Sequence, residues 1–194
     1  MMSDYILVAA IAYLIGSIPS GLILGKLFWH TDLREHGSHN IGATNAWRTF
    51  GKVAGIAVFI ADSLKGQAGV LLGLSCAGTP LAAVIGGLFA IIGHSFSLFL
   101  RFRGGKGVAT SLGVLTMLMG NVTVVVFLIW LAIVYTTRYV SLGSIIAGLL
   151  TPILAAAFEY PAEYLIFATI AATLVVLRHR ENINRLVHGT ESKI

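Results

Sequence analysis

The stretch from Leu81 to Leu100 reads LAAVIGGLFAIIGHSFSLFL, and it is followed at once by the basic segment RFRGGK, residues 101–106. An α-helix needs about 20 mainly apolar residues to cross roughly 30 Å of hydrocarbon. The stretch has that length and contains no Asp, Glu, Lys or Arg. It therefore predicts a transmembrane helix that ends at a basic loop on one surface of a membrane.

The whole chain has the same character. Its 194 residues are 57% hydrophobic and only 11% charged, and the mean hydropathy is +0.88. A soluble core of this size could not hide so much apolar surface. The net charge of +5 falls between apolar segments and not in a stripe on a soluble fold. It therefore favours attraction to lipid headgroups and anionic substrates over binding of nucleic acid.

We predict an all-α, polytopic membrane helix bundle, formed as a single domain over residues 1–194. Its seven predicted transmembrane helices, some of them short, are 5–29, 53–74, 81–100, 108–119, 122–137, 142–158 and 162–177. Pro19, within GSIPSG at 16–21, predicts a kink in the first helix because proline removes a backbone donor. Residues 108–119 are too few for an ordinary span and fit a short or re-entrant helix. Residues 30–52 are predicted to be a polar loop and residues 178–194 a polar tail.

The basic residues orient this arrangement. If the N-terminus is outside, twelve of the thirteen Lys and Arg residues lie on one side, and only Lys65 lies inside a span. The opposite side has Asp4, Glu159 and Glu163. Cytoplasmic loops are enriched in Lys and Arg, so we expect the basic loops and the C-terminus in the cytoplasm.

The first polar loop contains GSHNIGATN at 37–45, followed by Arg48. Small residues, hydroxyls and amides of this kind can present backbone N–H groups to a phosphate. The same composition also fits a turn-rich connector in which Asn and Gly only satisfy the backbone conformation. Composition alone leaves both interpretations open.

The second polar loop ends in GGKG at 104–107, directly before the predicted helix at Val108. Glycines permit close backbone approach, Lys106 supplies a positive charge, and a helix N-terminus attracts anions. This pattern favours phosphate binding over a basic anchor with flexible glycines. The spacing is not that of a Walker A loop.

Other familiar chemistry is missing from the sequence. There is no G-x-S-x-G motif, no metal-ligand spacing and no His followed five positions later by Asp, and Cys76 is the only cysteine. We therefore expect no metal and no cofactor, and an enzyme of this kind would need an activated substrate. Asp62 and Lys65 could form a pair within one helix. The sequence does not decide whether His94 is structural.

Five motifs together resemble the bacterial acyl-phosphate:glycerol-3-phosphate acyltransferases, the PlsY family. They are GSIPSG (16–21), GSHNIGATN (37–45), GGKGVAT (104–110), RYVSL (138–142) and RHREN (178–182), which occur in this order along the whole chain. One departure is His39, where the family more often has glycine, and it concerns the conformation of that turn.

The resemblance implies transfer of a fatty acyl group from acyl phosphate to the 1-position of sn-glycerol 3-phosphate. The products would be lysophosphatidic acid and phosphate, in the first acylation step of phospholipid synthesis. In the family, the substrate's own phosphate is thought to help deprotonate the acceptor hydroxyl. The resemblance also implies a bacterial inner-membrane location, a site on the cytoplasmic face, contact with membrane lipids and an upstream enzyme that forms acyl phosphate.

Site residues follow from the same resemblance. Ser38, Arg48 and Lys106 correspond to residues that contact phosphates and support catalysis. The positions that match the acyl-phosphate cradle are Asn40, Gly42, Ala43 and Thr44, with Gly104 and Gly105 in the second loop. Ser144, His179 and Asn182 match contacts to glycerol phosphate.

Two other functions use similar features. A transporter of a phosphorylated anion also has broken helices and glycine loops, but it should place polar residues at the bilayer midplane in two related halves. No convincing internal repeat is visible in this sequence. An acyl-CoA-dependent acyltransferase is disfavoured because the His-Asp spacing is absent.

Overall fold

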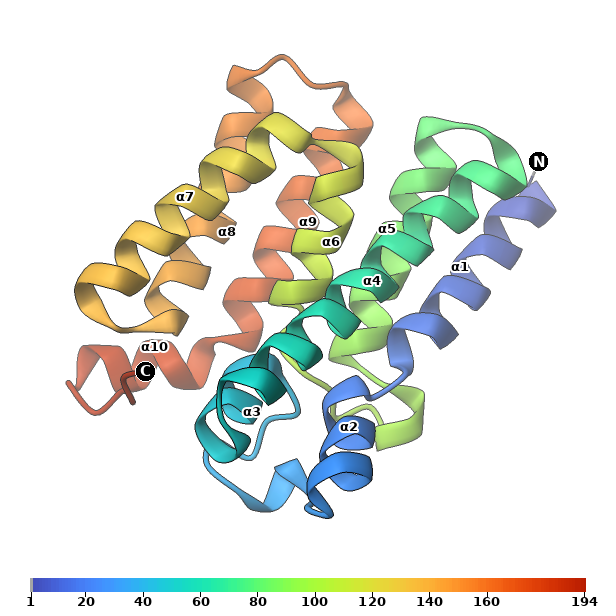
Figure 1. Ribbon diagram of the computed structural model, residues 1–194. Coiled ribbons are helices and arrows are strands. Elements are labelled where there is room, and N and C mark those ends of the chain that lie inside the picture. The colour runs from blue at the N-terminus through green and yellow to red at the C-terminus, as the bar shows by residue number, and fades with distance from the viewer. Residues whose placement is uncertain (1) are drawn as a thin grey trace. The chain divides into compact units, whose positions relative to one another are not determined.

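The computed structural model describes residues 2–194, and all regular structure in that range is helical (Figure 1). The all-α prediction is therefore confirmed. The chain forms two compact units, the first ending at Val114 and the second beginning at Leu115. Each unit is described by itself.

The first unit contains three long helices and a set of shorter ones. Its elements are α1 (Met2–Ser17), α2 (Ser20–Trp29), η1 (Leu33–Glu35), α3 (Ala43–Phe50), α4 (Lys52–Ala77), α5 (Pro80–Ser95), η2 (Leu98–Leu100) and the start of α6 (Val108–Leu118). The second unit contains the end of α6, then α7 (Gly120–Thr137), α8 (Val140–Ala157), α9 (Ala162–Arg178) and α10 (Arg180–Val187).

Close helix packing in the first unit depends on glycine. Helix α5 packs against both α1 and α4. A side-chain carbon added at Gly16 would overlap the backbone of Ala90, and one added at Gly93 would overlap the backbone of Tyr13. Small residues let membrane helices approach closely, because lipid provides no hydrophobic force between them and van der Waals contact must hold them together.

The predicted spans correspond to helices. Among residues 2–194, five helical segments are long and apolar enough to cross a membrane: Met2–Trp29, Lys52–Ala77, Pro80–Leu100, Gly120–Thr137 and Val140–Ala157. The pair α9 and α10, bent by 58°, would make a sixth span. Helix α6 is apolar but short, as its sequence indicated. The chain is thus a multi-pass membrane protein, and the count of seven stays a prediction.

The break in the first span lies at Pro19, as predicted. Helix α1 ends at Ser17 and α2 begins at Ser20. The carbonyl of Ile18, left outside the helical ladder, accepts hydrogen bonds from the N–H of Ser20 (3.0 Å) and from Lys65 Nζ (2.8 Å). A proline break is tolerated in lipid when neighbouring groups satisfy the freed backbone atoms in this way.

The prediction that residues 30–52 form only a loop was wrong. Helix α3 forms within this segment, and α4 already begins at Lys52. The buried face of α3 includes Ala46, which packs with Leu33, Ala54 and Val58. A polar composition excludes a lipid-facing span but still permits an amphipathic helix with one buried face. Helix α10 occupies the predicted polar tail for the same reason.

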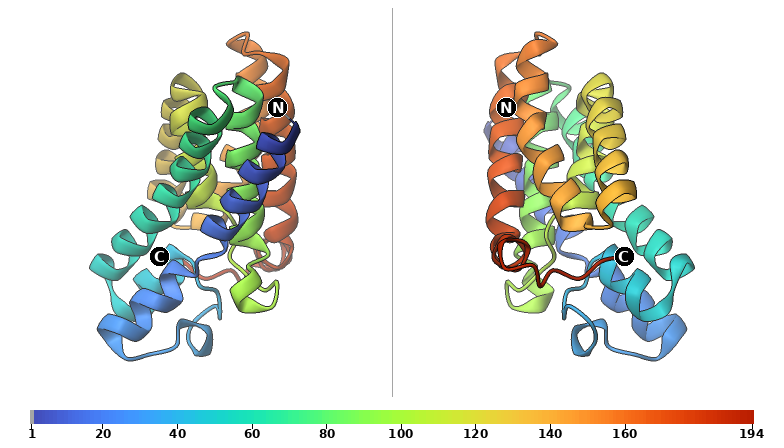
Figure 2. Two further views of the ribbon diagram at one scale, coloured as in Figure 1. Left: turned by 90° about the vertical axis from the view of Figure 1, so that its right-hand side faces the viewer. Right: turned by 90° about the vertical axis from the view of Figure 1, so that its left-hand side faces the viewer.

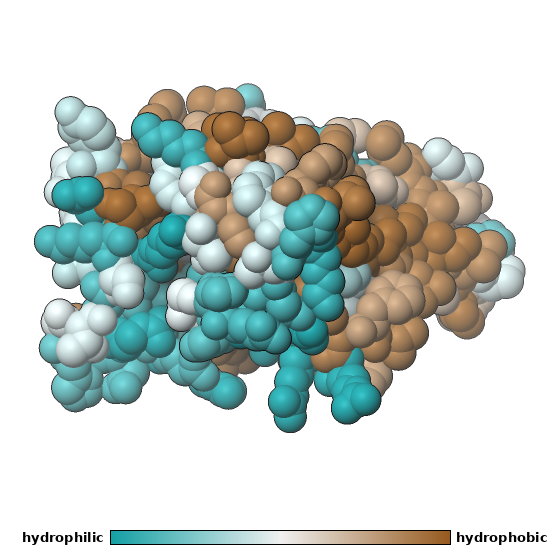
Figure 3. Space-filling model, turned by 60° about the horizontal axis from the view of Figure 1, so that its bottom comes forward, coloured by the Kyte–Doolittle hydropathy of each residue, from teal (hydrophilic) through white to brown (hydrophobic). Residues whose placement is uncertain are grey.

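Polar segments gather at one end of each unit. In the first unit, residues 30–51 and 96–107 lie at the same end, opposite the turn between α4 and α5 (Figures 1 and 2). In the second unit, α10 lies at the end that holds the turn between α7 and α8. Figure 3 shows hydrophilic residues gathered on one side of the view and hydrophobic residues on the other. Within each unit, the polar segments therefore share one end, and the orientation relative to the membrane stays a prediction.

The glycine contact between α1 and α5 can be tested by adding one methyl group. Gly16→Ala should lower the free energy of unfolding by about 1–3 kcal/mol, because the new carbon meets rigid backbone and forces the helices apart. Thermal unfolding in detergent measures the effect. Gly120→Ala is the matched control, because nothing lies within 4 Å of its added carbon. Equal unfolding midpoints for the two variants would contradict the close contact.

Candidate active site

The first polar loop is organised by one buried amide, that of Asn45 at the start of α3. Its Oδ1 accepts the backbone N–H of Ser38 (2.9 Å). Its Nδ2 lies within donating distance of the carbonyls of Leu33 (3.0 Å), His36 (2.9 Å) and Asn40 (2.8 Å). Asn45 is 1% exposed. A single side chain thus fixes the loop that carries Ser38 and Asn40.

Two further contacts shape the turn at residues 39–42. The backbone N–H of Gly42 donates to Asn40 Oδ1 (2.9 Å). His39 has a φ of 56°, in the left-handed region that favours glycine. Its ring Nδ1 lies 2.8 Å from the carbonyl of Arg34. The chain therefore adopts the left-handed turn with histidine at the position where the PlsY family more often has glycine.

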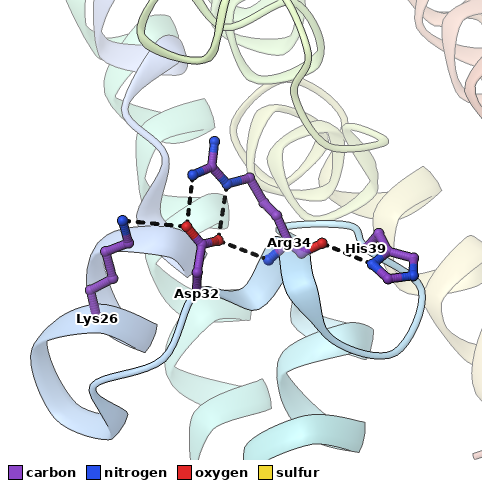
Figure 4. A network of polar contacts seen from close by, with 4 residues as sticks. All are labelled: Lys26, Asp32, Arg34 and His39. Atoms are coloured by element: carbon purple, nitrogen blue, oxygen red, sulfur yellow. Dashed lines mark hydrogen bonds and ion pairs between the residues drawn. The ribbon is translucent and has the colours of Figure 1, made fainter.

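An ion-pair network braces the outer side of this loop (Figure 4). Arg34 donates to both oxygens of Asp32, from Nε at 2.9 Å and from a terminal nitrogen at 2.7 Å. Lys26 Nζ lies 3.3 Å from the same carboxylate. The hydrogen bond from the Arg34 side chain holds the pKa of Asp32 well below its usual range. Asp32 therefore stays ionised and keeps η1 tied to the end of α2.

The predicted residues of the first loop surround the N-terminal end of α3. Gly42 is the N-cap residue, and Ala43 and Thr44 form the first turn. Helix N-termini carry partial positive charge and unpaired N–H groups, and both favour an anion. Ser38 is exposed, and Arg48 lies in the last turn of α3, half-buried. The segment can present hydroxyl, amide and guanidinium groups to a phosphate.

The second polar loop folds back onto the end of α5. The N–H groups of Gly104 and Gly105 donate to the carbonyls of Ser95 (3.2 Å) and His94 (3.0 Å). A side-chain carbon at Gly104 would overlap the backbone of His94, and one at Gly105 would overlap the His94 ring. Only glycine fits these two positions. The half-buried Lys106 follows directly.

Gly107 completes the turn into α6. Its φ is 79°, and its carbonyl accepts the N–H of Ser111 (2.7 Å) in the first turn of the helix. The second loop therefore combines close backbone packing, a lysine and a helix N-terminus. These are the features on which the sequence-based prediction of a phosphate site rested.

The buried charges of the first unit lie next to this loop. Asp62 Oδ1 is 2.8 Å from Lys65 Nζ and 3.6 Å from His94 Nδ1. Asp62, Lys65 and His94 are 2%, 6% and 4% exposed. The pairing of Asp62 with Lys65 along one helix was expected, but the approach of His94 from α5 was not visible in the sequence.

The remaining predicted residues lie in the second unit. Ser144 is buried in α8, where its hydroxyl donates to the carbonyl of Val140 (2.9 Å) and accepts from Trp130 Nε1 (3.3 Å). His179 is buried at the bend between α9 and α10, with Nδ1 2.7 Å from the carbonyl of Val175. Asn182 lies one turn further along the chain, in α10, and is also buried.

Glu191 is the feature of the second unit that sequence reasoning missed. It accepts hydrogen bonds from Ser141, Asn182 and Arg185, each at 2.7 Å. Burial raises the pKa of the Glu191 carboxyl, but these donors outweigh burial and the pKa is lowered. The one detectable signal was an acidic residue within a basic tail. Glu191 fixes the C-terminal segment and α10 against the start of α8.

The predicted site residues therefore form three groups. Those of the first loop are Ser38, Asn40, Gly42, Ala43, Thr44 and Arg48, and those of the second are Gly104, Gly105 and Lys106. Both loops lie at the polar end of the first unit (Figure 1). Ser144, His179 and Asn182 form the third group, within the second unit. Asn45 was part of the quoted motif but was not predicted as a site residue.

Fold and site together define a multi-pass helical membrane protein with two glycine- and amide-containing loops suited to bind phosphate groups. The family model described as glycerol-3-phosphate acyltransferase matches residues 6–189. The chain belongs to the glycerol-3-phosphate acyltransferase family, and it is an integral membrane acyltransferase.

Two relatives are similar to this chain over nearly its full length. Glycerol-3-phosphate acyltransferase 2 of Moorella thermoacetica is 46% identical, covering 98% of this chain and 97% of the relative. Glycerol-3-phosphate acyltransferase of Carboxydothermus hydrogenoformans is 45% identical, covering 97% and 96%. The resemblance expected from the five motifs is confirmed.

Solved structures agree as well. The integral membrane glycerol 3-phosphate acyltransferase PlsY (YgiH), in its glycerol 3-phosphate form, is similar with a TM-score of 0.93 and 40% identity, covering 98% of this chain and 95% of that one. The lysophosphatidic acid form of PlsY has a TM-score of 0.90 and 39% identity, with the same coverage.

The role of Asn45 predicts a selective loss of loop order. Asn45→Asp keeps the acceptor for the Ser38 N–H but removes the donors, and it places a carboxylate against three carbonyl oxygens. The free energy of unfolding should fall by about 2–4 kcal/mol, since three carbonyl acceptors lose their donor. Limited proteolysis should cut within residues 33–42 sooner than in the unsubstituted protein. Thr49→Val, on the same helix, should leave that rate unchanged; equal rates in all three proteins would refute the role of Asn45.

Proposed function

We propose that this acyltransferase uses acyl phosphate as its donor and acylates the 1-hydroxyl of sn-glycerol 3-phosphate. The hydroxyl oxygen attacks the acyl carbonyl carbon and loses its proton, and a new ester bond forms. The bond between that carbon and the phosphate oxygen breaks, so the products are lysophosphatidic acid and inorganic phosphate. The observation that carries this proposal is the pair of phosphate-suited loops at the polar end of the first unit.

The donor explains the choice of side chains. An acyl phosphate is a mixed anhydride with a good leaving group, so positioning and charge stabilisation can supply much of the rate. Neither loop needs a protein nucleophile for this reaction. A lysine and an arginine suit the task, because each stabilises negative charge on the departing phosphate.

We assign the residue roles by loop. Ser38, Arg48 and Lys106 contact the phosphates and support catalysis. The cradle for the acyl-phosphate group consists of Asn40, Gly42, Ala43, Thr44, Gly104 and Gly105. Ser144, His179 and Asn182 bind glycerol 3-phosphate, whose own phosphate assists removal of the hydroxyl proton.

The membrane setting follows from the chemistry of the two substrates. A fatty acyl chain belongs in hydrocarbon, while glycerol 3-phosphate is soluble in water, so the reaction belongs at a membrane surface. We place the site on the cytoplasmic face of a bacterial inner membrane, because the polar ends of both units carry the basic residues. A separate enzyme must supply the acyl phosphate. Transport of a phosphorylated anion is not supported by family membership.

The donor is tested by comparing two activated acyl compounds. Purified protein in detergent should release phosphate from palmitoyl phosphate only when glycerol 3-phosphate is present, and lysophosphatidic acid should form in equal amount. Palmitoyl-CoA should give no product. Turnover with palmitoyl-CoA but not with palmitoyl phosphate would overturn the proposed donor.

Lys106 should be needed for the reaction and not for the fold. Lys106→Ala should lower kcat/KM by about 10²-fold or more, because it removes a charge from the phosphate site, while the unfolding midpoint stays within a few degrees. Lys106→Arg should recover only part of the rate, since the guanidinium differs in shape from an ammonium. Lys52→Ala is the control, because Lys52 is exposed at the beginning of α4. Rates for Lys106→Ala equal to this control would remove Lys106 from the site.

A further inference from the structure

We propose that His94 is a positioning residue, held in place by Asp62, that supports the glycine loop 104–107 and thereby the place of Lys106. This inference rests on the proposed function of that loop. It assigns a role to two buried residues whose purpose the sequence left open.

His94 contacts the loop directly. The backbone carbonyl of His94 accepts the N–H of Gly105 at 3.0 Å. The ring also lies against Gly105, because a side-chain carbon at Gly105 would overlap its Nε2 atom. His94 therefore contacts the residue before Lys106 with both backbone and side chain.

The buried carboxylate of Asp62 lies on the other side of the His94 ring. Asp62 Oδ1 lies 3.6 Å from Nδ1, so the two ring nitrogens face different partners, Asp62 on α4 and Gly105 in the loop. Asp62 is 2% exposed and His94 is 4% exposed. At 3.6 Å this contact is longer than a hydrogen bond, but the negative charge of the carboxylate favours the ring orientation in which Nδ1 faces it. A rotated ring would lose this contact or meet the loop.

Lys65 connects Asp62 and His94 to the break in the first span. Lys65 lies 2.8 Å from the same Asp62 oxygen and donates to the carbonyl of Ile18. The segment after α5 is tied to the same break, since Ser97 Oγ donates to the carbonyl of Ser17 (2.5 Å). Asp62 is therefore held by a fixed cation, and the end of α5 is held beside it.

These contacts indicate how loss of the His94 ring would affect the loop. His94 is buried beneath the loop backbone and acts through Gly105, so it positions and does not take part in bond making. Loss of the ring should leave the helices packed but let the loop shift. A misplacement of about 1 Å at a reacting group can reduce a rate by about 10²-fold.

The decisive experiment measures the kinetics of His94→Gln, Asp62→Asn and the double variant, with palmitoyl phosphate and glycerol 3-phosphate as substrates. Each single variant should lower kcat/KM by about 10- to 100-fold, and His94→Gln should keep an unfolding midpoint near that of the unsubstituted enzyme. Because Asp62 acts through His94, the double variant should be no worse than His94→Gln alone. Additive losses, or a kcat/KM for His94→Gln equal to that of the unsubstituted enzyme, would overturn the proposal.

A second measurement needs no substrate and separates this inference from the proposed function. Amide hydrogen exchange of the peptide covering residues 101–108 should be faster in His94→Gln, because the loop has lost its support. Thr123→Val is the control: Thr123 is buried in α7, where its hydroxyl donates to the carbonyl of Met119 (2.9 Å). In Thr123→Val, the amide hydrogen exchange of residues 101–108 and the kcat/KM should both equal those of the unsubstituted enzyme.

Failure of the proposed function and failure of the role of His94 give different results. If the unsubstituted protein does not turn over palmitoyl phosphate, the proposed function has failed, and hydrogen exchange still decides the support role of His94. Unchanged exchange in His94→Gln overturns the inference whatever the activity. If Asp62→Asn fails to fold because Lys65 is left without its counter-charge, His94→Gln alone gives the answer.

Discussion

The structure depends on satisfying the backbone where the first span is broken. Pro19 ends one helix, and in hydrocarbon the freed carbonyl of Ile18 would be costly without a partner. The N–H of Ser20 and the Nζ of Lys65 both donate to it, and the buried charge of Lys65 is balanced by Asp62 on the same helix. The broken backbone is thus joined to a buried ion pair within the first unit. The same carboxylate reaches His94, so the constraint extends to the loop that carries Lys106.

Buried polar side chains also organise the surface around the site. Asn45 holds the first loop through four backbone groups, and Glu191 gathers three donors at the start of α8. Neither residue is exposed enough to act on a substrate directly. Each fixes a segment on which predicted site residues lie, namely Ser38 in the first unit and Asn182 in the second. Pre-organisation of this kind suits an acyltransferase that works by position and charge.

Much of the function could be predicted because the motifs are local in sequence. A phosphate-suited loop needs glycines, a lysine and a following helix, and all of these lie within GGKGVAT at 104–110. The helix α3 could not be found in this way, because a polar composition hid an amphipathic segment whose buried face rests on Leu33, Ala54 and Val58. The departure at His39 was recognised, but only the φ of 56° shows that the histidine adopts the left-handed conformation that glycine favours.

The sequence by itself determined the membrane class and the break in the first span. Each of these follows from the length, hydropathy and charge of consecutive residues, which are properties of a segment and not of its neighbours. Only the tertiary structure decided that His94 faces Asp62 and Gly105, and that Glu191 reaches Ser141. Those contacts join residues that are between 11 and 50 positions apart, so they depend on how the helices pack. Helix packing is set by close backbone approach at residues such as Gly16, whose partners no local pattern in one sequence can name.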